Sequence, residues 1–162
     1  MSAQVVLITG ALTGIGRATA VAFAKKGAKV VVSGRHDDKG RALVTVLQAL
    51  GAEAEFVRAD VRKEDDVRAL VDRTVAKFGR LDAAVNNAAV EGQLGPIQDA
   101  TVENFRAVHD ANVFGVFLSM KHELRAMAGQ SSGSIVNITS TYGHKAAAYA
   151  TALSAASSQW RA

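Results

Sequence analysis

Apolar, β-branched runs alternate along this chain with stretches in which apolar residues recur at helical spacing. The first, second and fourth runs are apolar over most of their length, which suits strands that helices cover on both faces. Each of these three runs is followed by a helical stretch, and that order is typical of a parallel, doubly wound α/β sheet. The five predicted strands are Gln4 to Thr9, Ala28 to Ser33, Ala54 to Ala59, Leu81 to Asn87 and Ser134 to Thr139.

Two helices have clear sequence signals. Lys25, Lys26 and Gly27 end the first predicted helix, because cations and a left-handed glycine are favoured at a helix C-terminus. The longest predicted helix covers roughly Val102 to Met127, and its apolar residues lie mostly three or four positions apart. We expect these apolar residues to pack in the core and at a subunit interface. They are Phe105, Val108, Val113, Val116, Phe117, Met120, Leu124 and Met127.

The composition is that of one ordinary globular domain. The chain has 162 residues, of which 49% are hydrophobic and 21% charged, and no linker or repeat divides it, so we predict a single domain over residues 1–162. Cysteine is absent, which excludes disulfides, thiolate nucleophiles and sulfur-ligated metal sites. No apolar run approaches the ~20 residues of a membrane helix, and the N-terminus does not resemble a signal peptide. We therefore expect a cytoplasmic protein with no membrane partner.

The charge pattern does not indicate nucleic-acid binding. The formal net charge is +4, but the 19 Lys and Arg residues are spread along the chain. A nucleic-acid site would instead gather them in one basic run with interleaved aromatics.

A glycine-rich turn follows the first predicted strand. Gly10, Gly14 and Gly16 lie within Thr9 to Ala20, between a strand and a helix. Glycine lets the backbone approach a ligand closely, and the following helix points free N–H groups and its positive dipole end at a phosphate. The glycine spacing is G-x-x-x-G-x-G rather than G-x-G-x-x-G, and the alternative is a turn that binds no ligand. We favour a pyrophosphate site.

Five sequence signals occur in order along the chain: Thr9 to Gly16, Asp60-Val61, Asn86 to Ala89, Asn112 and Ser140. Together they make the chain resemble the classical branch of the short-chain dehydrogenases/reductases. The resemblance implies a Rossmann-type sheet with strand order 3-2-1-4-5, helices on both faces, and a nicotinamide cofactor at the carboxyl ends of the strands. It extends to about Gly143, and the family pattern is lost after roughly Lys145, which we interpret as a C-terminal truncation or alteration.

The resemblance also implies which residues bind the cofactor. The glycine turn would hold the pyrophosphate, and Asp60 would accept a hydrogen bond from the adenine amino group, although Asp60 could instead cap a helix. Asn87 would support the nicotinamide side of the site, and Ala89 departs from the glycine usual in the family. The implied binding residues are Gly10, Thr13, Gly14, Ile15, Gly16, Asp60, Val61, Asn87 and Ala88.

The end of the second strand favours NADP over NAD. An acid there would hydrogen-bond the ribose hydroxyls of NAD and repel a 2′-phosphate, whereas arginine would bind that phosphate. The acid position is Gly34, and Arg35 follows it; Arg17 is a weaker candidate for the phosphate partner. NAD stays the alternative, because Asp37 and Asp38 follow closely.

The catalytic residues that the resemblance implies are Asn112, Ser140 and Tyr149. In the family a tyrosine donates its proton to the substrate carbonyl, and a lysine four residues later lowers the phenol pKa. Here Leu153 stands at the lysine position, and Tyr149 is only nine residues after Ser140, about one helical turn short of the family interval. The family interval places Leu153 at the tyrosine position and Ser157 at the lysine position, so neither alignment restores the pair.

Loss of the lysine matters because a phenol with a pKa near ~10 is ionised in only about one molecule in a thousand at neutral pH. Lys145 lies four residues before Tyr149 and could share a helical face with it. We nevertheless interpret Tyr149 as a packing residue of the alanine-rich segment Ala146 to Ser158.

Three hypotheses for function follow. The leading one is a family member that binds NADP and is weak or inactive in interconverting a small-molecule carbonyl and an alcohol. The second is a working oxidoreductase that uses Tyr149 with Lys145 or completes its site from another subunit. The third is a non-catalytic dinucleotide-binding or interaction protein. We also expect a homo-oligomer, assembled through Val102 to Met127 and Ala146 to Trp160.

Overall fold

The computed structural model describes residues 3–145 and 147–160. Strands and helices alternate as the sequence predicts. In chain order they are β1 (Val5–Ile8), α1 (Gly14–Lys25), β2 (Lys29–Gly34), α2 (Asp37–Ala49), β3 (Ala54–Arg58), α3 (Glu64–Phe78), β4 (Ala83–Asn86), η1 (Ile97–Asp99), α4 (Val102–His109), η2 (Asp110–Phe114), α5 (Gly115–Met127), β5 (Ser134–Asn137), η3 (Thr141–Gly143) and α6 (Thr151–Ser158).

The sheet has the predicted topology. Its five strands are all parallel, in the order β3-β2-β1-β4-β5, with Leu7 level with Val31 on one side and Ala84 on the other. The described residues of β1 are fully buried, because this strand lies at the centre of the sheet and both its faces are covered. The predicted fold class and strand order are confirmed.

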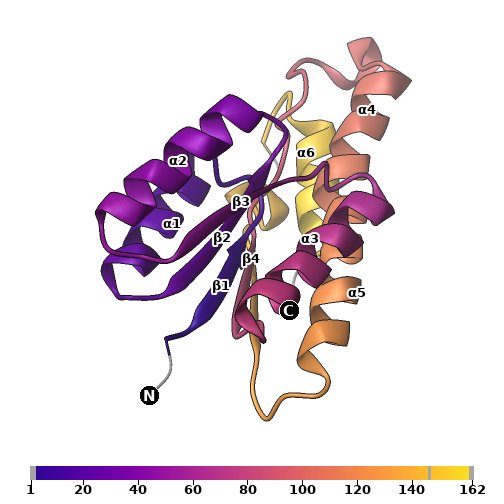
Figure 1. Cartoon of the computed structure of the whole chain (residues 1–162). Coiled ribbons are helices and arrows are strands. Elements are labelled where there is room, and N and C mark those ends of the chain that lie inside the picture. The colour runs from indigo at the N-terminus through magenta and orange to yellow at the C-terminus, as the bar shows by residue number, and fades with distance from the viewer. Residues whose placement is uncertain (1–2, 146, 161–162) are drawn as a thin grey trace.

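Helices cover both faces of the sheet (Figure 1). On one face α1 and α2 pack over alternate strand residues such as Ile8 and Val32; on the other, α3 and α5 pack over Leu7 and Val31. The first helix ends as predicted, with Lys26 at its C-cap and Gly27 at a φ of 77°. Among the helices the structure describes, none is both long and apolar enough to cross a membrane.

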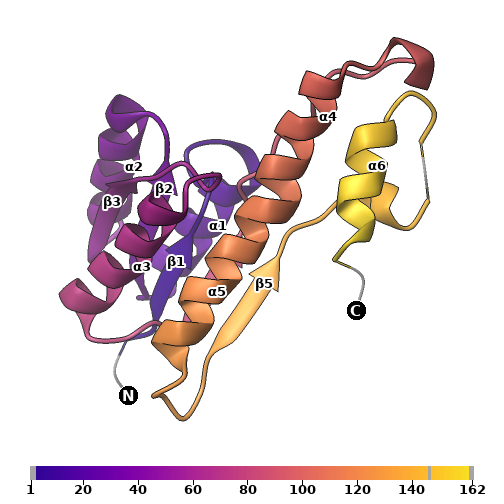
Figure 2. The same cartoon turned by 90° about the vertical axis from the view of Figure 1, so that its right-hand side faces the viewer.

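The predicted long helix is continuous but contains a wide turn. α4 and α5 run on from one another (Figure 2), joined by the π-helical segment η2. Only part of its apolar set is in the core: Val108 and Val116 are buried, whereas Phe105, Phe117 and Leu124 are about half exposed. These three residues therefore lie outside the core of the single chain, and only the expected subunit interface could bury them.

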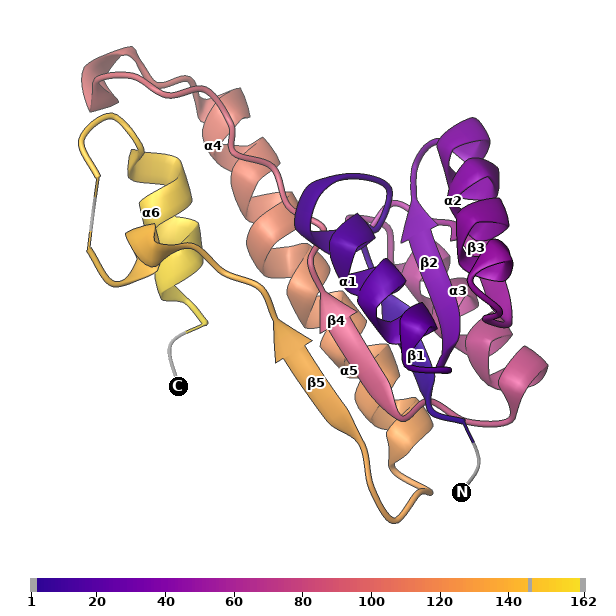
Figure 3. The ribbon, with the colours of Figure 1, turned by 90° about the vertical axis from the view of Figure 1, so that its left-hand side faces the viewer.

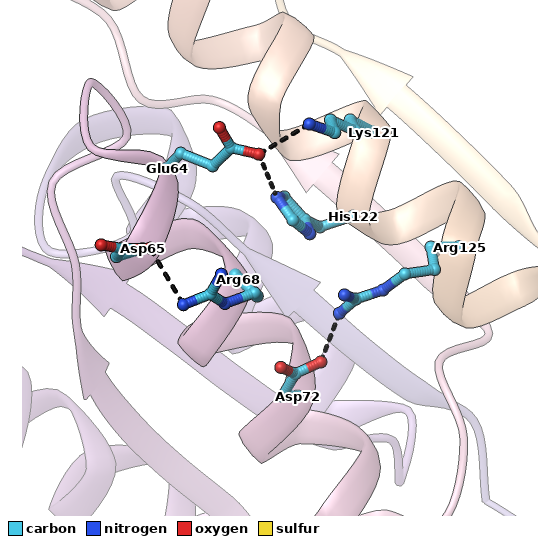
Figure 4. A network of polar contacts seen from close by, with 7 residues as sticks. All are labelled: Glu64, Asp65, Arg68, Asp72, Lys121, His122 and Arg125. Carbon is cyan, nitrogen blue, oxygen red and sulfur yellow. Dashed lines mark hydrogen bonds and ion pairs between the residues drawn. The ribbon is translucent and has the colours of Figure 1, made fainter.

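Polar contacts hold α3 against α5 (Figure 4). The Glu64 carboxylate accepts hydrogen bonds from the Lys121 ammonium at 2.7 Å and pairs with His122 at 3.2 Å. Asp72 and Arg125 form a second ion pair between the two helices. These pairs fix how α5 lies on the sheet, and they thereby help to position η2 and α4, which precede α5 in the same continuous helix.

The C-terminal segment differs from the prediction. β5 is an edge strand whose Val136 is 48% exposed, and α6 lies beyond the carboxyl end of β5, beside α4 (Figure 2, Figure 3). Tyr149 precedes α6, has a φ of 66° and is 61% exposed, so its interpretation as a packing residue is wrong. Lys145 also lies outside any helix, so the two do not share a helical face. Ala146, the predicted start of this segment, lies outside the described residues.

Candidate functional site

A cavity of about 860 Å³ opens at the carboxyl ends of β1 to β4. This is where parallel sheets with helices on both faces bind ligands, because the loops leaving neighbouring strands meet there. Nine of the ten residues proposed for cofactor binding line it, and Gly16 is the exception. The lining nine are Gly10, Thr13, Gly14, Ile15, Arg35, Asp60, Val61, Asn87 and Ala88.

Gly16 shapes the site by close packing. A Cβ placed on Gly16 would lie 2.5 Å from Asn87 Nδ2 and 2.6 Å from the Gly10 carbonyl oxygen. The absent side chain lets the Asn87 amide donate to the Thr9 and Gly10 carbonyls at 3.2 and 3.0 Å. The turn after β1 is thereby tied to the loop after β4.

Gly10 makes the second close approach in this turn. It has a φ of 61°, and a Cβ there would lie 2.6 Å from Ala88 Cα. The Thr9 hydroxyl completes the junction by accepting hydrogen bonds from the Asn87 and Ala88 backbone N–H groups. A residue other than glycine would be strained at this φ and would push β4's loop away.

The N-terminus of α1 faces the cavity through Gly14 and Ile15. Its N-cap, Thr13, makes no side-chain capping bond, and the first turn carries no acidic residue. The free backbone N–H groups and the positive end of the helix dipole are therefore available to an anion.

Basic side chains line the cavity beyond β2. Arg35 is joined there by His36 and Lys39, which the sequence analysis did not single out. Lys39 follows Arg35 by four positions across the start of α2. This spacing in the sequence could have indicated that the two cations lie on the same side of the site. Asp37 pairs instead with Arg58 at 3.4 Å, and neither Asp37 nor Asp38 is among the residues that line the cavity.

Asp60 is fixed by Arg62. The Arg62 guanidinium donates to both carboxylate oxygens, at 2.9 Å from Nε and 2.5 Å from Nη2. These hydrogen bonds lower the pKa of Asp60 to about 2, although partial burial acts in the opposite direction. Asp60 does not cap α3, because the N-cap is Lys63. The alternative of a helix cap is therefore wrong.

A buried polar cluster lies beneath the end of β4. Asn86 donates to Glu123 Oε2 and to Asn137 Oδ1, each at 3.0 Å, and so joins β4 to α5 and β5. Glu123 is 1% exposed, and burial raises its pKa to about 7, against the effect of the hydrogen bond from Asn86. This cluster sets the position of the strand end from which Asn87 projects.

Asn112 lies in η2 and holds the loop after β4. Its side-chain amide donates to the Val90 carbonyl at 2.8 Å and accepts from the Val90 N–H at 2.9 Å. Its own carbonyl accepts a hydrogen bond from the Trp160 indole at 2.9 Å. Val90 lines the cavity and Asn112 does not. Asn112 therefore holds the cavity wall in place through the backbone of Val90.

Ser140 and Tyr149 do not line the cavity. The Ser140 hydroxyl accepts a hydrogen bond from the Tyr142 N–H at 3.2 Å and caps η3. Tyr149 contributes its carbonyl to a hydrogen bond from the Gly95 N–H at 2.8 Å, while its side chain is exposed. Neither is among the described residues that line the cavity.

Comparison of this chain with known proteins shows which family and which solved structures it resembles. The sequence pattern of the family described as short chain dehydrogenase matches residues 4–158. A 3beta-hydroxysteroid dehydrogenase of Mediterraneibacter gnavus is 39% identical over 150 residues, which are 90% of this chain and 54% of that protein. The chain therefore spans about half the length of this curated relative.

Two solved structures carry the same fold. NAD+-bound xylitol dehydrogenase matches with a TM-score of 0.93 and 32% identity, over 96% of this chain and 60% of that one. Actinorhodin polyketide ketoreductase with NADPH matches with a TM-score of 0.92 and 35% identity, again over 96% and 60%. One of these relatives thus holds NAD+ and the other NADPH.

Proposed function

Since the chain belongs to the short-chain dehydrogenase family, we propose that it binds NADP(H) and is weak or inactive in interconverting a carbonyl and an alcohol. The observation that carries the proposal is the basic lining of the cavity beyond β2. Arg35, His36 and Lys39 all line it there, and Gly34 stands where an acid would bind the ribose of NAD. A phosphate on the adenine ribose is favoured by such a surface, whereas the ribose hydroxyls of NAD gain no carboxylate partner.

The remainder of the cavity fits a dinucleotide. The pyrophosphate is proposed to bind at the N-terminus of α1, at Thr13, Gly14 and Ile15, where no acid competes for the free N–H groups. Asp60 and Val61 would bind the adenine, and Asn87 and Ala88 the nicotinamide end. A bound nicotinamide would supply or accept the hydride, and Asn87 and Ala88 would orient it.

The doubt about catalysis rests on the three residues proposed to carry it. Tyr149 is exposed, Ser140 accepts a hydrogen bond from its own turn, and Asn112 is engaged with Val90. Leu153 stands four positions after Tyr149, where the family resemblance places a lysine. The alternative function is therefore non-catalytic dinucleotide binding.

A homo-oligomer is also proposed. Phe105, Phe114, Phe117 and Leu124 form an exposed apolar face of α4 to α5, and the Phe114 and Phe117 rings stack with centroids 6.2 Å apart. An apolar patch of this kind is typical of a protein interface.

Calorimetric titration with NADPH and NADH, repeated on Arg35→Ala, tests the cofactor proposal. We expect NADPH to bind at least about tenfold more tightly than NADH, and we expect Arg35→Ala to remove most of that difference, because a charged hydrogen bond contributes ~1.5–3 kcal/mol. Arg17→Ala tests the weaker candidate; Arg17 is not among the described residues that line the cavity, so this change should preserve the preference. Equal affinities for the two cofactors in the parent chain would defeat the proposal.

A further inference from the structure

The segment Val90 to Gln93 continues the cavity wall after β4 and runs beside α4 (Figure 3). Val90 and Glu91 line the cavity on the side of β1 opposite to Arg35, because β4 and β2 flank β1 on its two sides. The position of this segment therefore decides the shape of the cavity at the end away from the basic side chains.

Two asparagines of one helix hold the two ends of the segment in the same way. Asn112 exchanges two hydrogen bonds with the backbone of Val90, at 2.8 and 2.9 Å. Asn104 exchanges two with the backbone of Gln93: the Gln93 N–H donates to Oδ1 at 2.7 Å, and Nδ2 donates to the Gln93 carbonyl at 3.2 Å. Each side-chain amide thus satisfies both polar groups of one residue, as a neighbouring β-strand would.

The middle of the segment packs on the same face of the helix. Gly92 has a φ of 78°, and a Cβ there would lie 2.5 Å from Val108 Cγ2 and 2.8 Å from Asn104 Oδ1. Asn104, Val108 and Asn112 are four residues apart in turn, so the segment runs antiparallel along one row of the helix.

The π-helical turn aligns this row. In a regular α-helix, positions eight residues apart differ by about 80° around the axis. η2 accommodates about one extra residue in a wide turn, which brings Asn112 back toward the face of Asn104. Asn104 is itself fixed at the start of α4, because its N–H donates to the N-cap Thr101 hydroxyl at 3.1 Å.

From this geometry we infer that Asn104 is a positioning residue of the cofactor site. With Asn112, it holds Val90 to Gln93 in place before a ligand arrives, so that the wall beside the nicotinamide end needs no ordering on binding. Asn104 acts through the backbone and does not itself line the cavity. The role of the wall in cofactor binding rests on the proposed function, whereas the coupling of the two asparagines does not.

Amide hydrogen exchange in the ligand-free protein tests the coupling. The Val90 N–H bonds to Asn112 and makes no direct contact with Asn104, so Asn104→Ala should accelerate its exchange only if the two asparagines act together. We expect an acceleration of about tenfold or more at Val90, measured relative to the core amide of Val31, which corrects for any global loss of stability. Arg106→Ala, an exposed change on the same helix, should leave the Val90 rate unchanged. Faster exchange at Gln93 with an unchanged rate at Val90 would overturn the inference.

Calorimetry with NADPH and with 2′,5′-ADP, its adenine half, tests the link to the cofactor. We expect Asn104→Ala to weaken NADPH binding about tenfold and to change 2′,5′-ADP binding less than about twofold, because the wall lies away from the basic end. Asn104→Asp retains the acceptor for Gln93 and should be intermediate. An equal loss for both ligands, or no loss for NADPH, would refute a positioning role. If the parent chain binds neither ligand, the proposed function fails and the link to the cofactor fails with it, while the exchange rates still decide the coupling.

Discussion

Gly16 shows how one missing side chain shapes this site. It is predicted to bind the pyrophosphate, and its small size also admits the Asn87 amide, which ties the turn after β1 to the loop after β4. Glycine spacing alone could not separate these two roles, because the neighbour that needs the space is about 70 residues away in the sequence.

Replacement of Gly16 by alanine should therefore displace Asn87 and weaken cofactor binding. Its Cβ would meet Asn87 Nδ2 at 2.5 Å, which forces that side chain to move, and the Gly10 carbonyl oxygen at 2.6 Å, which only a shift of backbone can relieve. We expect a loss of about tenfold or more in NADPH affinity and a lower thermal midpoint, corresponding to ~1–3 kcal/mol of strain. Gly129→Ala is the control, since nothing lies within 4 Å of its Cβ position. An unchanged affinity in Gly16→Ala would contradict the packing role.

At the scale of elements, α5 is joined to β4 by a carboxylate that the structure buries. Glu123 is 1% exposed, and burial raises its pKa to about 7. An exposed surface position would be the usual expectation for a glutamate in a helix, because charged residues are rarely fully buried. The sequence offered no signal for this joint, since its partner Asn86 lies on a different element.

The raised pKa predicts how stability depends on pH. Between about pH 4.5 and pH 7 the unfolded chain loses the Glu123 proton while the folded protein keeps it, so the free energy of unfolding falls as pH rises. The fall is on the order of 3 kcal/mol and should be complete above about pH 7. Urea titrations at pH 5 and pH 8 measure it. Glu123→Gln should remove most of the difference in unfolding free energy between pH 5 and pH 8, and it should be more stable than the parent chain at pH 8. Glu103→Gln, a change at an exposed position of α4, should retain the difference. A parent-like difference in Glu123→Gln would show that another group is responsible.

The strands could be predicted from the sequence, whereas the structure of the C-terminal segment could not. β1 and β2 have long apolar runs because helices cover both faces, and this pattern indicates a parallel sheet directly. The alanine-rich stretch around Tyr149 has no such pattern, and α6 begins only at Thr151. Side-chain partners such as Asn104 with Gln93 depend on a loop conformation that periodicity does not encode.

At the scale of the whole molecule, the exposed apolar face of α4 to α5 predicts self-association. Phe114, Phe117 and Leu124 are each about half exposed in the single chain, and their burial between two copies would remove apolar surface from water. We expect a dimer or larger assembly at micromolar concentration by light scattering coupled to size exclusion. Phe117→Glu should dissociate it, whereas Arg106→Glu, an exposed polar position, should not. A parent chain that elutes as a monodisperse monomer of 16.9 kDa would contradict the expectation.

Single-turnover kinetics tests most directly the proposal that this chain binds NADP(H) without assembling the tyrosine and lysine pair that its family resemblance implies. NADPH is first bound to saturation, as followed by its fluorescence, and then mixed with a panel of ketones in a stopped-flow instrument while the nicotinamide absorbance is recorded. We predict saturable binding, slow or absent reduction, and a change of less than about threefold on Tyr149→Phe or Ser140→Ala, because neither side chain lines the cavity. A fall of about a hundredfold on loss of the Tyr149 hydroxyl, equivalent to ~2.7 kcal/mol of activation free energy, would show that this tyrosine is the proton donor after all.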